Sequence, residues 1–192
     1  MSPTLKKHSV LLRLLPFVSL IAIIVLWNMF FGTLSVWAAL LGVGGGLLLW
    51  SFMEYTMHRF AFHHLFGPTE GKELPLHLKH HEEPTFPSYN LTPLHFSIPF
   101  TLVVWGLLRL AVGSWQRTTP IVVGAVAGYL TYELLHYAIH MRSTSGGILF
   151  RVLRRNHFIH HFKANDSCYG VTNPLWDFIF RTLPQTRRQI QF

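Results

Sequence analysis

Histidine is the residue type whose number and spacing stand out in this sequence. There are 13 histidines in 192 residues, and ten of them fall into two similar series. Neutral imidazole nitrogens are good ligands for iron, zinc, copper and nickel. Ten imidazoles are too many for one ion and suit two, so the sequence predicts a site for two metal ions. The predicted ligands are His58, His63, His77, His80 and His81 in the first series, and His136, His140, His157, His160 and His161 in the second.

The spacing within each series places several imidazoles on common helix faces. Positions i, i+3 and i+4 of an α-helix share a face, and each series ends in an H-x-x-H-H cluster with this spacing. The three histidines of each cluster are therefore expected to converge on a single point. These clusters are His77, His80 and His81, and His157, His160 and His161.

The first two histidines of each series differ in spacing. His136 and His140 are four residues apart and should share a helix face. His58 and His63 are five residues apart, and an α-helix turns by ~500° over five residues, which leaves the side chains ~140° apart. A helix end, a kink or a π-bulge is therefore expected between His58 and His63.

Three residues near the histidines are candidates for supporting the site. Glu54 and Glu133 precede His58 and His136 by four and three residues, near the ends of apolar stretches where acidic groups are costly. Ligand histidines usually donate their second ring N–H to a carboxylate or a carbonyl. We therefore expect both glutamates to orient ligands; direct ligation and a helix-end ion pair are the alternatives. Tyr132 either lines the same site or packs as an ordinary apolar aromatic.

The other histidines and the single cysteine fit ordinary roles. His8, His64 and His95 lie outside the pattern and are typical of polar side chains that reach the membrane surface. The same interpretation of all ten patterned histidines is the alternative to a metal site. Cys168 is the only cysteine, so neither an internal disulfide nor a thiolate metal knuckle can form.

Four apolar stretches can position the histidines at a membrane. They cover residues 14–31, 34–53, 96–112 and 120–139, and a helix that crosses a bilayer needs ~20 residues. Half of the chain is hydrophobic and only 12% is charged, against ~25% in soluble domains. The first stretch is too long for the core of a signal peptide, and 35–38 is a poor cleavage site. We therefore expect it to remain as a membrane span.

The connections between the stretches predict the topology. The first two stretches are joined by a short loop, and so are the last two, with Pro120 expected in the first turn of the fourth helix. We predict a single all-α integral membrane domain over residues 1–192. It has four transmembrane helices in two hairpins, and segments 54–95 and 140–192 form a helical cap that carries the histidines.

The distribution of charge predicts an orientation. The formal net charge is +8, and 14 of the 16 lysines and arginines lie in residues 1–13, in the middle segment or after residue 140. By the positive-inside rule, both termini and the histidine segments should be cytosolic, in a bacterial inner membrane or an ER-type membrane. The basic residues lie between apolar runs and form no stripe on a polar chain, which excludes a nucleic-acid partner.

The ordered set of motifs resembles the fatty acid hydroxylase / sterol desaturase superfamily, and the spacing is most similar to fatty acid 2-hydroxylases. The resemblance covers residues 40–185 approximately, and the pair Tyr132–Glu133 stands where the family is expected to have a tyrosine–aspartate pair. The matching pieces are H-x4-H from His58, H-x2-H-H from His77, H-x3-H from His136, H-x2-H-H from His157, and the tails 169–172 and 176–182.

The resemblance implies a chemistry and its partners. It implies two iron ions, or zinc in a purified sample, and O2 as the oxidant that hydroxylates or desaturates a lipid, foremost a fatty acyl chain. Such hydroxylases often carry a fused haem-cytochrome domain, for which 192 residues leave no room, so a separate electron-donor protein is expected.

Three alternatives remain open. The lipid substrate can be a carotenoid or a sterol. The chain can also be a non-catalytic haem-binding membrane protein, whose ligands should lie singly within the spans, or a metal-binding carrier, which needs polar residues along a path through the spans. Clustered histidines at the ends of apolar stretches favour the enzyme.

Overall fold

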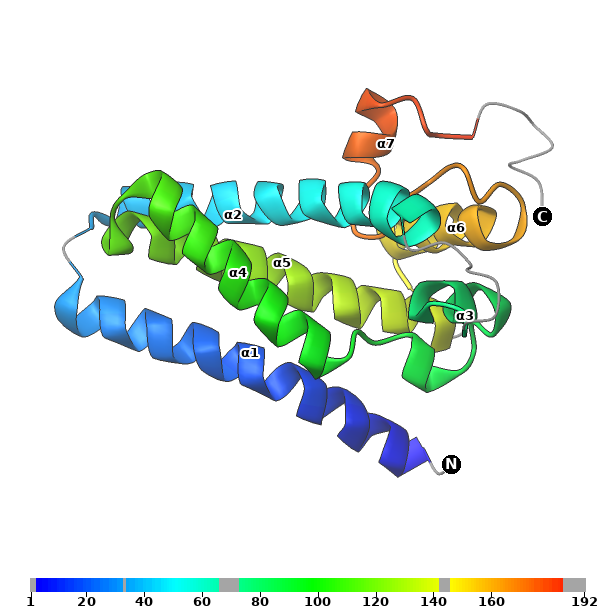
Figure 1. The fold of residues 1–192 in the computed structure, drawn as a ribbon, viewed down its shortest axis with the longest axis horizontal. Helices are drawn as coiled ribbons and strands as arrows, with labels where there is room; N and C mark the ends of the chain where they lie inside the picture. The colour runs from blue at the N-terminus through cyan, green and yellow to red at the C-terminus, as the bar shows by residue number, and fades with distance from the viewer. Residues whose placement is uncertain (1–2, 33, 66–72, 142–145, 185–192) are drawn as a thin grey trace. The chain divides into compact units, whose positions relative to one another are not determined.

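The computed structural model describes residues 3–32, 34–65, 73–141 and 146–184, with only the backbone described for residues 3–9. The regular elements of these residues are all helical, as predicted (Figure 1). They are α1 (Pro3–Phe31), α2 (Val36–Thr56), the π-helix η1 (Met57–Leu65), α3 (Leu76–Glu82), the 3-10 helix η2 (Pro87–Tyr89), α4 (Leu94–Val112), α5 (Trp115–Met141), α6 (Ile148–Phe162) and α7 (Leu175–Ile179).

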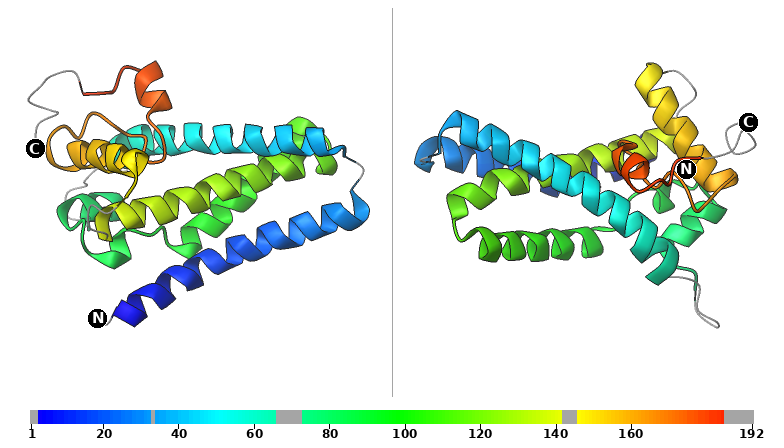
Figure 2. Two further views of the ribbon diagram at one scale, coloured as in Figure 1. Left: turned by 180° about the vertical axis from the view of Figure 1, so that it is seen from behind. Right: turned by 90° about the horizontal axis from the view of Figure 1, so that it is seen from above.

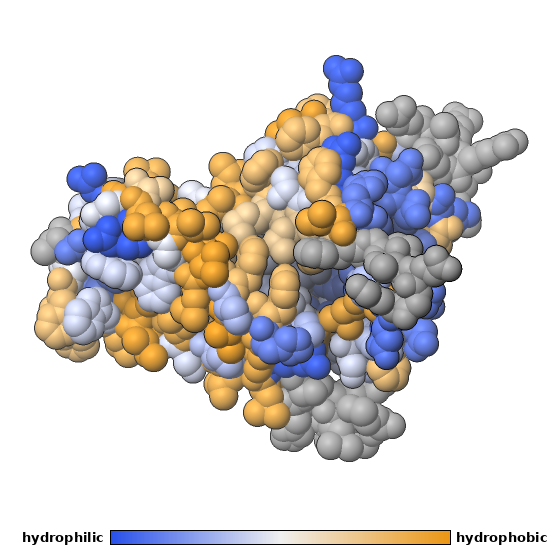
Figure 3. Space-filling view, in the orientation of Figure 1, coloured by the Kyte–Doolittle hydropathy of each residue, from blue (hydrophilic) through white to orange (hydrophobic). Residues whose placement is uncertain are grey.

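Four helical segments of the described chain are long and apolar enough to cross a membrane. They are Val10–Phe31, Val36–Leu65, Pro87–Val112 and Trp115–Met141. Large apolar side chains on them are exposed, for example Leu41 at 78% and Leu110 at 80%, and apolar side chains cover much of the face of these helices in Figure 3. The chain is therefore an integral membrane protein, as predicted. The pairing into hairpins and the cytosolic cap stay predictions.

The start of the fourth span differs from the prediction. Pro120 lies inside α5, five residues after its start at Trp115, and not in its first turn. The helix begins earlier because Ser114 caps it: the Ser114 hydroxyl accepts from the Arg117 backbone N–H at 3.5 Å, and its carbonyl accepts from the Thr118 N–H at 3.0 Å. A serine at this position satisfies N–H groups that have no partner within the helix.

The described chain forms two compact units. The first comprises Met1–Trp50 and Leu91–Thr131, and the second comprises Ser51–Asn90 and Tyr132–Phe192. In the first unit, α2 and α5 approach closely because glycines face each other. A Cβ on Gly46 would collide with the backbone of α5, and one on Gly124 with the backbone of α2. Small residues allow such contacts between helices in membranes.

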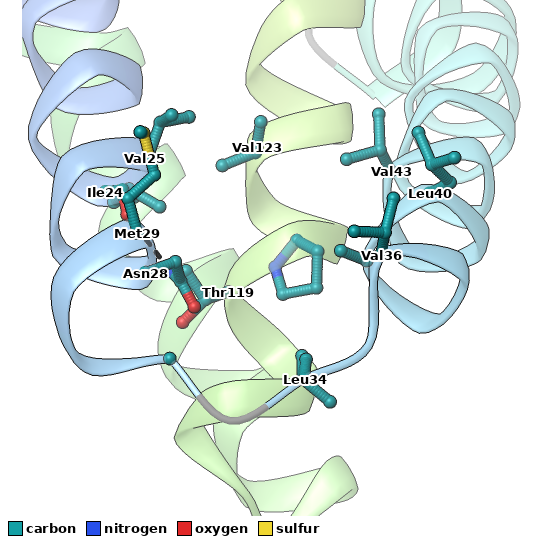
Figure 4. A pocket seen from close by; sticks show the side chains of 13 residues that line it. Ile24, Val25, Asn28, Met29, Leu34, Val36, Leu40, Val43, Thr119 and Val123 are labelled. Carbon is teal, nitrogen blue, oxygen red and sulfur yellow. Dashed lines mark hydrogen bonds between the residues drawn. The ribbon is translucent and has the colours of Figure 1, made fainter.

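An apolar pocket lies in the first unit between α1, α2 and α5 (Figure 4). Its volume is about 360 Å³, and no lining residue carries a charge. The Asn28 side chain lines it but donates to the Ile24 carbonyl of its own helix at 2.9 Å. The pocket therefore offers an apolar surface without a chemical group free to react.

The second unit contains the histidine-bearing segments. It comprises the end of α2 with η1, the end of α5, and α3, η2, α6 and α7. α3 and α6 are far apart in the sequence but lie side by side (Figure 2), and the rings of His81 and His161 stack between them. This unit brings the two histidine series together.

Candidate metal centre

The ten predicted histidines form two groups of five. Within each group, one ring nitrogen from every histidine lies within 4.8 Å of the others. The first, called here the His58 group, consists of His58, His63, His77, His81 and His160. The second, called the His136 group, consists of His80, His136, His140, His157 and His161.

His80 and His160 exchange places between the two groups, and this corrects a prediction. The three histidines of each H-x-x-H-H cluster do not converge on one point: the central histidine of each joins the group formed by the other series. The reason is angular. Two neighbouring residues such as His80 and His81 are ~100° apart around an α-helix, whereas His77 and His81 are only ~40° apart. Each H-x-x-H-H helix therefore supplies two ligands to one group and one to the other.

The π-helix brings His58 and His63 together. From Met57 to Leu65 the backbone follows the i→i+5 hydrogen-bond pattern of a π-helix, so residues five apart come to nearly the same face. The ring centroids of His58 and His63 are 5.2 Å apart. The predicted irregularity between these two histidines is therefore confirmed, and it extends over nine residues. His136 and His140 lie in one group on the regular helix α5, also as predicted.

The facing Nε2 atoms have the spacing of ligands around a shared cation. In the His58 group, His63 lies 3.0 Å from His160 and 3.0 Å from His77. In the His136 group, His157 lies 2.8 Å from His140 and 3.0 Å from His161. Two imidazole nitrogens about 2.1 Å from one ion and at right angles are about 3.0 Å apart.

The opposite ring nitrogens show that lone pairs point inward. Nδ1–H of His58 donates to the Tyr169 carbonyl at 2.6 Å, and Nδ1–H of His160 donates to the Ser167 carbonyl at 2.7 Å. A neutral imidazole protonated at Nδ1 carries only a lone pair at Nε2. Nε2 of His58 is buried and has no hydrogen-bond partner among the described residues. Converging lone pairs repel unless a cation lies between them, so the donor set fits metal ions.

Burial keeps the imidazoles neutral. Desolvation, followed by the charges of neighbouring histidines, holds the pKa of His77, His157 and His160 well below the usual range. The same causes lower the pKa of His81 to about 3. The lone pairs of these four side chains are therefore available at neutral pH.

Glu54 hydrogen-bonds to the segment that follows Tyr169, and among the described residues none of its hydrogen bonds goes to a histidine. Its carboxylate accepts from the backbone N–H groups of Val171 and Thr172 at 2.6 and 2.9 Å, and from the Thr172 hydroxyl at 2.6 Å. These residues follow Tyr169, whose carbonyl holds His58. An orienting role of Glu54 stays a prediction, and these hydrogen bonds would make it an indirect one, through the backbone.

Asp177 holds the same segment from its other side. The carboxylate accepts from the backbone N–H of Tyr169 at 2.9 Å, from that of Gly170 at 2.8 Å, and from the Thr182 hydroxyl at 2.7 Å. Burial raises the pKa of Asp177 above its usual range, while these hydrogen bonds act in the opposite direction. The two buried carboxylates Glu54 and Asp177 thus fix the loop that orients His58.

The remaining sequence candidates have clear positions. Tyr132 stacks on His136, with ring centroids 5.4 Å apart and planes at 8°, so it lines the site. Glu133 is buried at 1% exposure, one helical turn before His136. His64 and His95 are exposed and belong to neither group. The side chain of His8 lies outside the described residues.

Several positioning groups escaped the sequence reasoning. The carbonyls of Tyr169, Ser167 and Asn90 accept from ligand histidines, the last from His136 at 3.2 Å. Backbone carbonyls carry no residue-type signal. Asp177 did carry one, because it is an acidic residue between large apolar residues near the chain's end, where a buried carboxylate needs partners. Cys168 is buried, and desolvation raises the pKa of its thiol to about 12, so it is inert.

Comparisons with known proteins agree with this geometry. The family model of fatty acid hydroxylases matches residues 43–182. A dihydroceramide fatty acyl 2-hydroxylase of Arabidopsis thaliana is 34% identical over an alignment of 146 residues, and the match covers 74% of this chain and 60% of that protein. The fatty acid 2-hydroxylase of Mus musculus is 32% identical, with 72% of this chain and 38% of that protein covered. The chain thus spans about 60% and 38% of the lengths of these two relatives.

A solved structure shares the fold. It is described as full-length scs7p with only the hydroxylase domain visible, and it matches with a TM-score of 0.67 at 21% identity. The match covers 95% of this chain and 65% of that one. The family match spans most of the chain and contains all ten clustered histidines. The chain therefore belongs to the fatty acid hydroxylase family, whose members are oxidoreductases.

Proposed function

We propose that this chain hydroxylates a fatty acyl lipid with O2, at a centre of two metal ions held by the His58 and His136 groups. The observation that carries the proposal is the convergence of five ring nitrogens in each group, within a chain of the fatty acid hydroxylase family. Five imidazoles per ion leave coordination space for a further ligand. Iron is the metal expected in the cell, because the reaction is oxidative and zinc has no redox chemistry.

The overall reaction sets the requirements of the site. One oxygen atom of O2 enters a C–H bond, and the other leaves as water after taking up two electrons and two protons. When bound, the metal ions supply the activation of O2. The protein holds the imidazoles in position: Tyr169, Ser167 and Asn90 fix the rings of His58, His160 and His136 through Nδ1. The two electrons come from a separate donor protein.

The substrate class follows from the relatives and from the membrane setting. The two relatives described above are named for a fatty acid and for the fatty acyl chain of dihydroceramide, and both names specify position 2. The four candidate spans place the chain in a bilayer, where acyl chains surround it. We therefore propose an acyl chain, oxidised next to its carbonyl carbon, over a sterol or carotenoid.

The orientation proposed from charge makes the centre accessible to a cytosolic donor. If 14 of 16 basic residues lie on the cytosolic side, both termini and the two histidine series face the cytosol. A soluble or peripheral electron donor can then approach the histidine groups while the lipid stays in the bilayer.

Lipid mass spectrometry of cells with and without the gene tests the function. We expect acyl chains that are heavier than the unmodified chains by one oxygen atom (~16 Da) only in cells with the wild-type protein, and not in cells with His160→Ala. The exposed His64→Ala variant is the matched control and should retain the product. Oxygenated sterols or carotenoids with unchanged acyl chains would move the assignment to those substrates. Unchanged lipids of all three classes, with the chain present in the membrane, would contradict it.

A further inference from the structure

The short helix α7 exposes an apolar face outside the four candidate spans. Leu175, Phe178, Ile179 and Phe180 are 44%, 72%, 50% and 45% exposed. Exposed scattered apolar residues are ordinary, but four large ones within six residues form a patch that marks an interaction site. The helix on which α7 packs indicates what covers this patch.

α7 packs against α2 at Ser51 and Phe52 (Figure 1). The indole N–H of Trp176 donates to the Ser51 hydroxyl at 3.0 Å. The Trp176 ring also meets Phe52 edge to face, with centroids 4.8 Å apart. Both partners belong to the candidate membrane span Val36–Leu65. The seat of α7 is therefore part of a helix that crosses the membrane.

The length of α2 places this seat at membrane depth. α2 is continuous from Val36, and the 15 residues from Val36 to Ser51 cover ~22 Å at 1.5 Å per residue. The hydrocarbon core is ~30 Å thick. Trp37, 77% exposed at the start of α2, is of the type that marks the membrane–water interface. With Trp37 at one interface, Ser51 lies within the core or at its far edge.

We propose that α7 lies in the bilayer as a short monotopic segment seated on α2, with Leu175, Phe178 and Ile179 in contact with lipid acyl chains. The chain turns back directly after this segment. Arg181 has a φ of 56°, and the Thr182 backbone N–H then donates to the Asp177 carbonyl at 2.8 Å. The exposed Arg181 side chain can reach lipid phosphates while the apolar residues remain among the acyl chains.

This seat couples the bilayer to a ligand of the proposed metal centre. α7 carries Asp177, which accepts from the Tyr169 N–H, and the Tyr169 carbonyl accepts from His58. Two hydrogen bonds therefore separate α7 from the imidazole of His58. A bilayer that keeps α7 on α2 also keeps His58 in its orientation.

Site-directed spin labelling of the full chain in lipid nanodiscs tests the depth of α7. The discs contain phosphatidylethanolamine and phosphatidylglycerol, and one nitroxide is attached to Phe178→Cys and, in a second sample, to Ile179→Cys. Cys168 is buried and its thiol has a pKa raised to about 12, so the label reacts with the introduced cysteine. Glu83→Cys, exposed in the second unit just after α3, is the aqueous control.

Relaxation by O2, which concentrates in lipid, is compared with relaxation by a water-soluble nickel chelate. We expect an O2-to-nickel ratio several times higher at positions 178 and 179 than at position 83. An equal ratio would place α7 in water and overturn the proposal. Weak relaxation by both agents would indicate that protein, and not lipid, covers the label, and this result would also overturn the proposal. Because the measurement requires neither metal nor turnover, its failure would leave the proposed hydroxylase function untouched.

A charge on the lipid-facing side tests the coupling to His58, which rests on the proposed function. Phe178→Asp should release α7 from the bilayer and lower the metal content of nanodisc samples towards one ion per chain, whereas Phe178→Leu should leave the content unchanged. Unchanged metal content in Phe178→Asp, with a spin label at position 179 that has moved into water, would separate α7 from the metal centre and overturn the coupling.

Discussion

The imidazole rings of His81 and His161 stack face to face, with centroids 4.1 Å apart and planes at 14°. The two residues belong to different groups, so their rings form a shared wall between the His58 and His136 groups. Each ring also has a neighbour in sequence, His80 or His160, that serves the other group. The two groups therefore share both their supporting helices and a ring contact.

This shared wall predicts that the two metal sites are coupled. Replacing His161 with Ala removes a ligand from the His136 group and also the stacking partner of His81. We expect metal binding in the intact His58 group to weaken by about 1 kcal/mol, the size of an aromatic pair contact. Calorimetric metal titrations of the wild type, His81→Ala, His161→Ala and the double variant measure this coupling. Additive effects of the two substitutions on metal affinity would show that the stacked rings do not couple the two groups.

The second prediction is the number of ions. We expect elemental analysis of the purified chain to give two metal ions per chain, with iron or zinc depending on how the protein was prepared. A strong chelator should abolish hydroxylation, and iron should restore it. One metal ion or fewer per chain, in protein shown to have lost no metal during purification, would contradict a two-ion centre.

The exchanged histidines give the sharpest single substitutions. His80→Ala and His160→Ala each remove one buried histidine from a group. The other four members of that group come from the other series. We expect each to abolish activity and to lower metal content in the group that loses the ligand. His64, adjacent to the ligand His63 but exposed, should tolerate Ala without loss of metal or activity. Full activity in His160→Ala would rule out the metal-centre interpretation.

Glu54 should behave as a positioning residue. Glu54→Ala leaves the N–H groups of Val171 and Thr172 without their acceptor, at a cost of about 1–3 kcal/mol for each buried group. Glu54→Gln keeps one carbonyl oxygen and should lose less. Removal of such supporting contacts lowers metal affinity about 10- to 100-fold. Metal titrations of both variants test this, with thermal unfolding to separate affinity from stability; equal affinity in all three proteins would refute the role.

The fifth prediction concerns membrane orientation. Because 14 of 16 basic residues lie in residues 1–13, 54–95 or 140–192, reporter fusions at the C-terminus and within residues 70–74 should both report the cytosol. Two fusions on opposite sides would place a ~30 Å hydrocarbon core between the series. The two histidine groups could not form in that case.

The sequence predicted the helices and the histidines that come together well, because both depend on local pattern. Apolar stretches long enough for a bilayer became helices, and all ten patterned histidines entered a group. The bounds were less accurate: the second span continues through η1 to Leu65, beyond the predicted end at residue 53. Its last residues include His58 and His63, whose polarity ended the apolar pattern while the helix itself continued.

The partition of the histidines depends on tertiary structure and could not be predicted. Helix periodicity places His77, His80 and His81 on one broad face, but a face does not specify which of two nearby centres each side chain reaches. That depends on how α3 meets α6 in the second unit. The carbonyls of Tyr169 and Ser167 were equally hidden, because they act through backbone atoms that every residue possesses.

The exchange of His80 and His160 has a consequence for biosynthesis. When only the first histidine series has been synthesised, the nascent chain contains four of the five histidines of the His58 group and one of the five histidines of the His136 group. Neither group can be completed before the chain has been synthesised through α6 and folded upon itself. In the proposed two-metal centre, loading of both groups with a redox-active ion would thereby wait until the polypeptide is nearly finished. A chain terminated before α6 would lack His157, His160 and His161, so it could complete neither group of the proposed centre, which limits the oxidative damage that an incomplete product could cause.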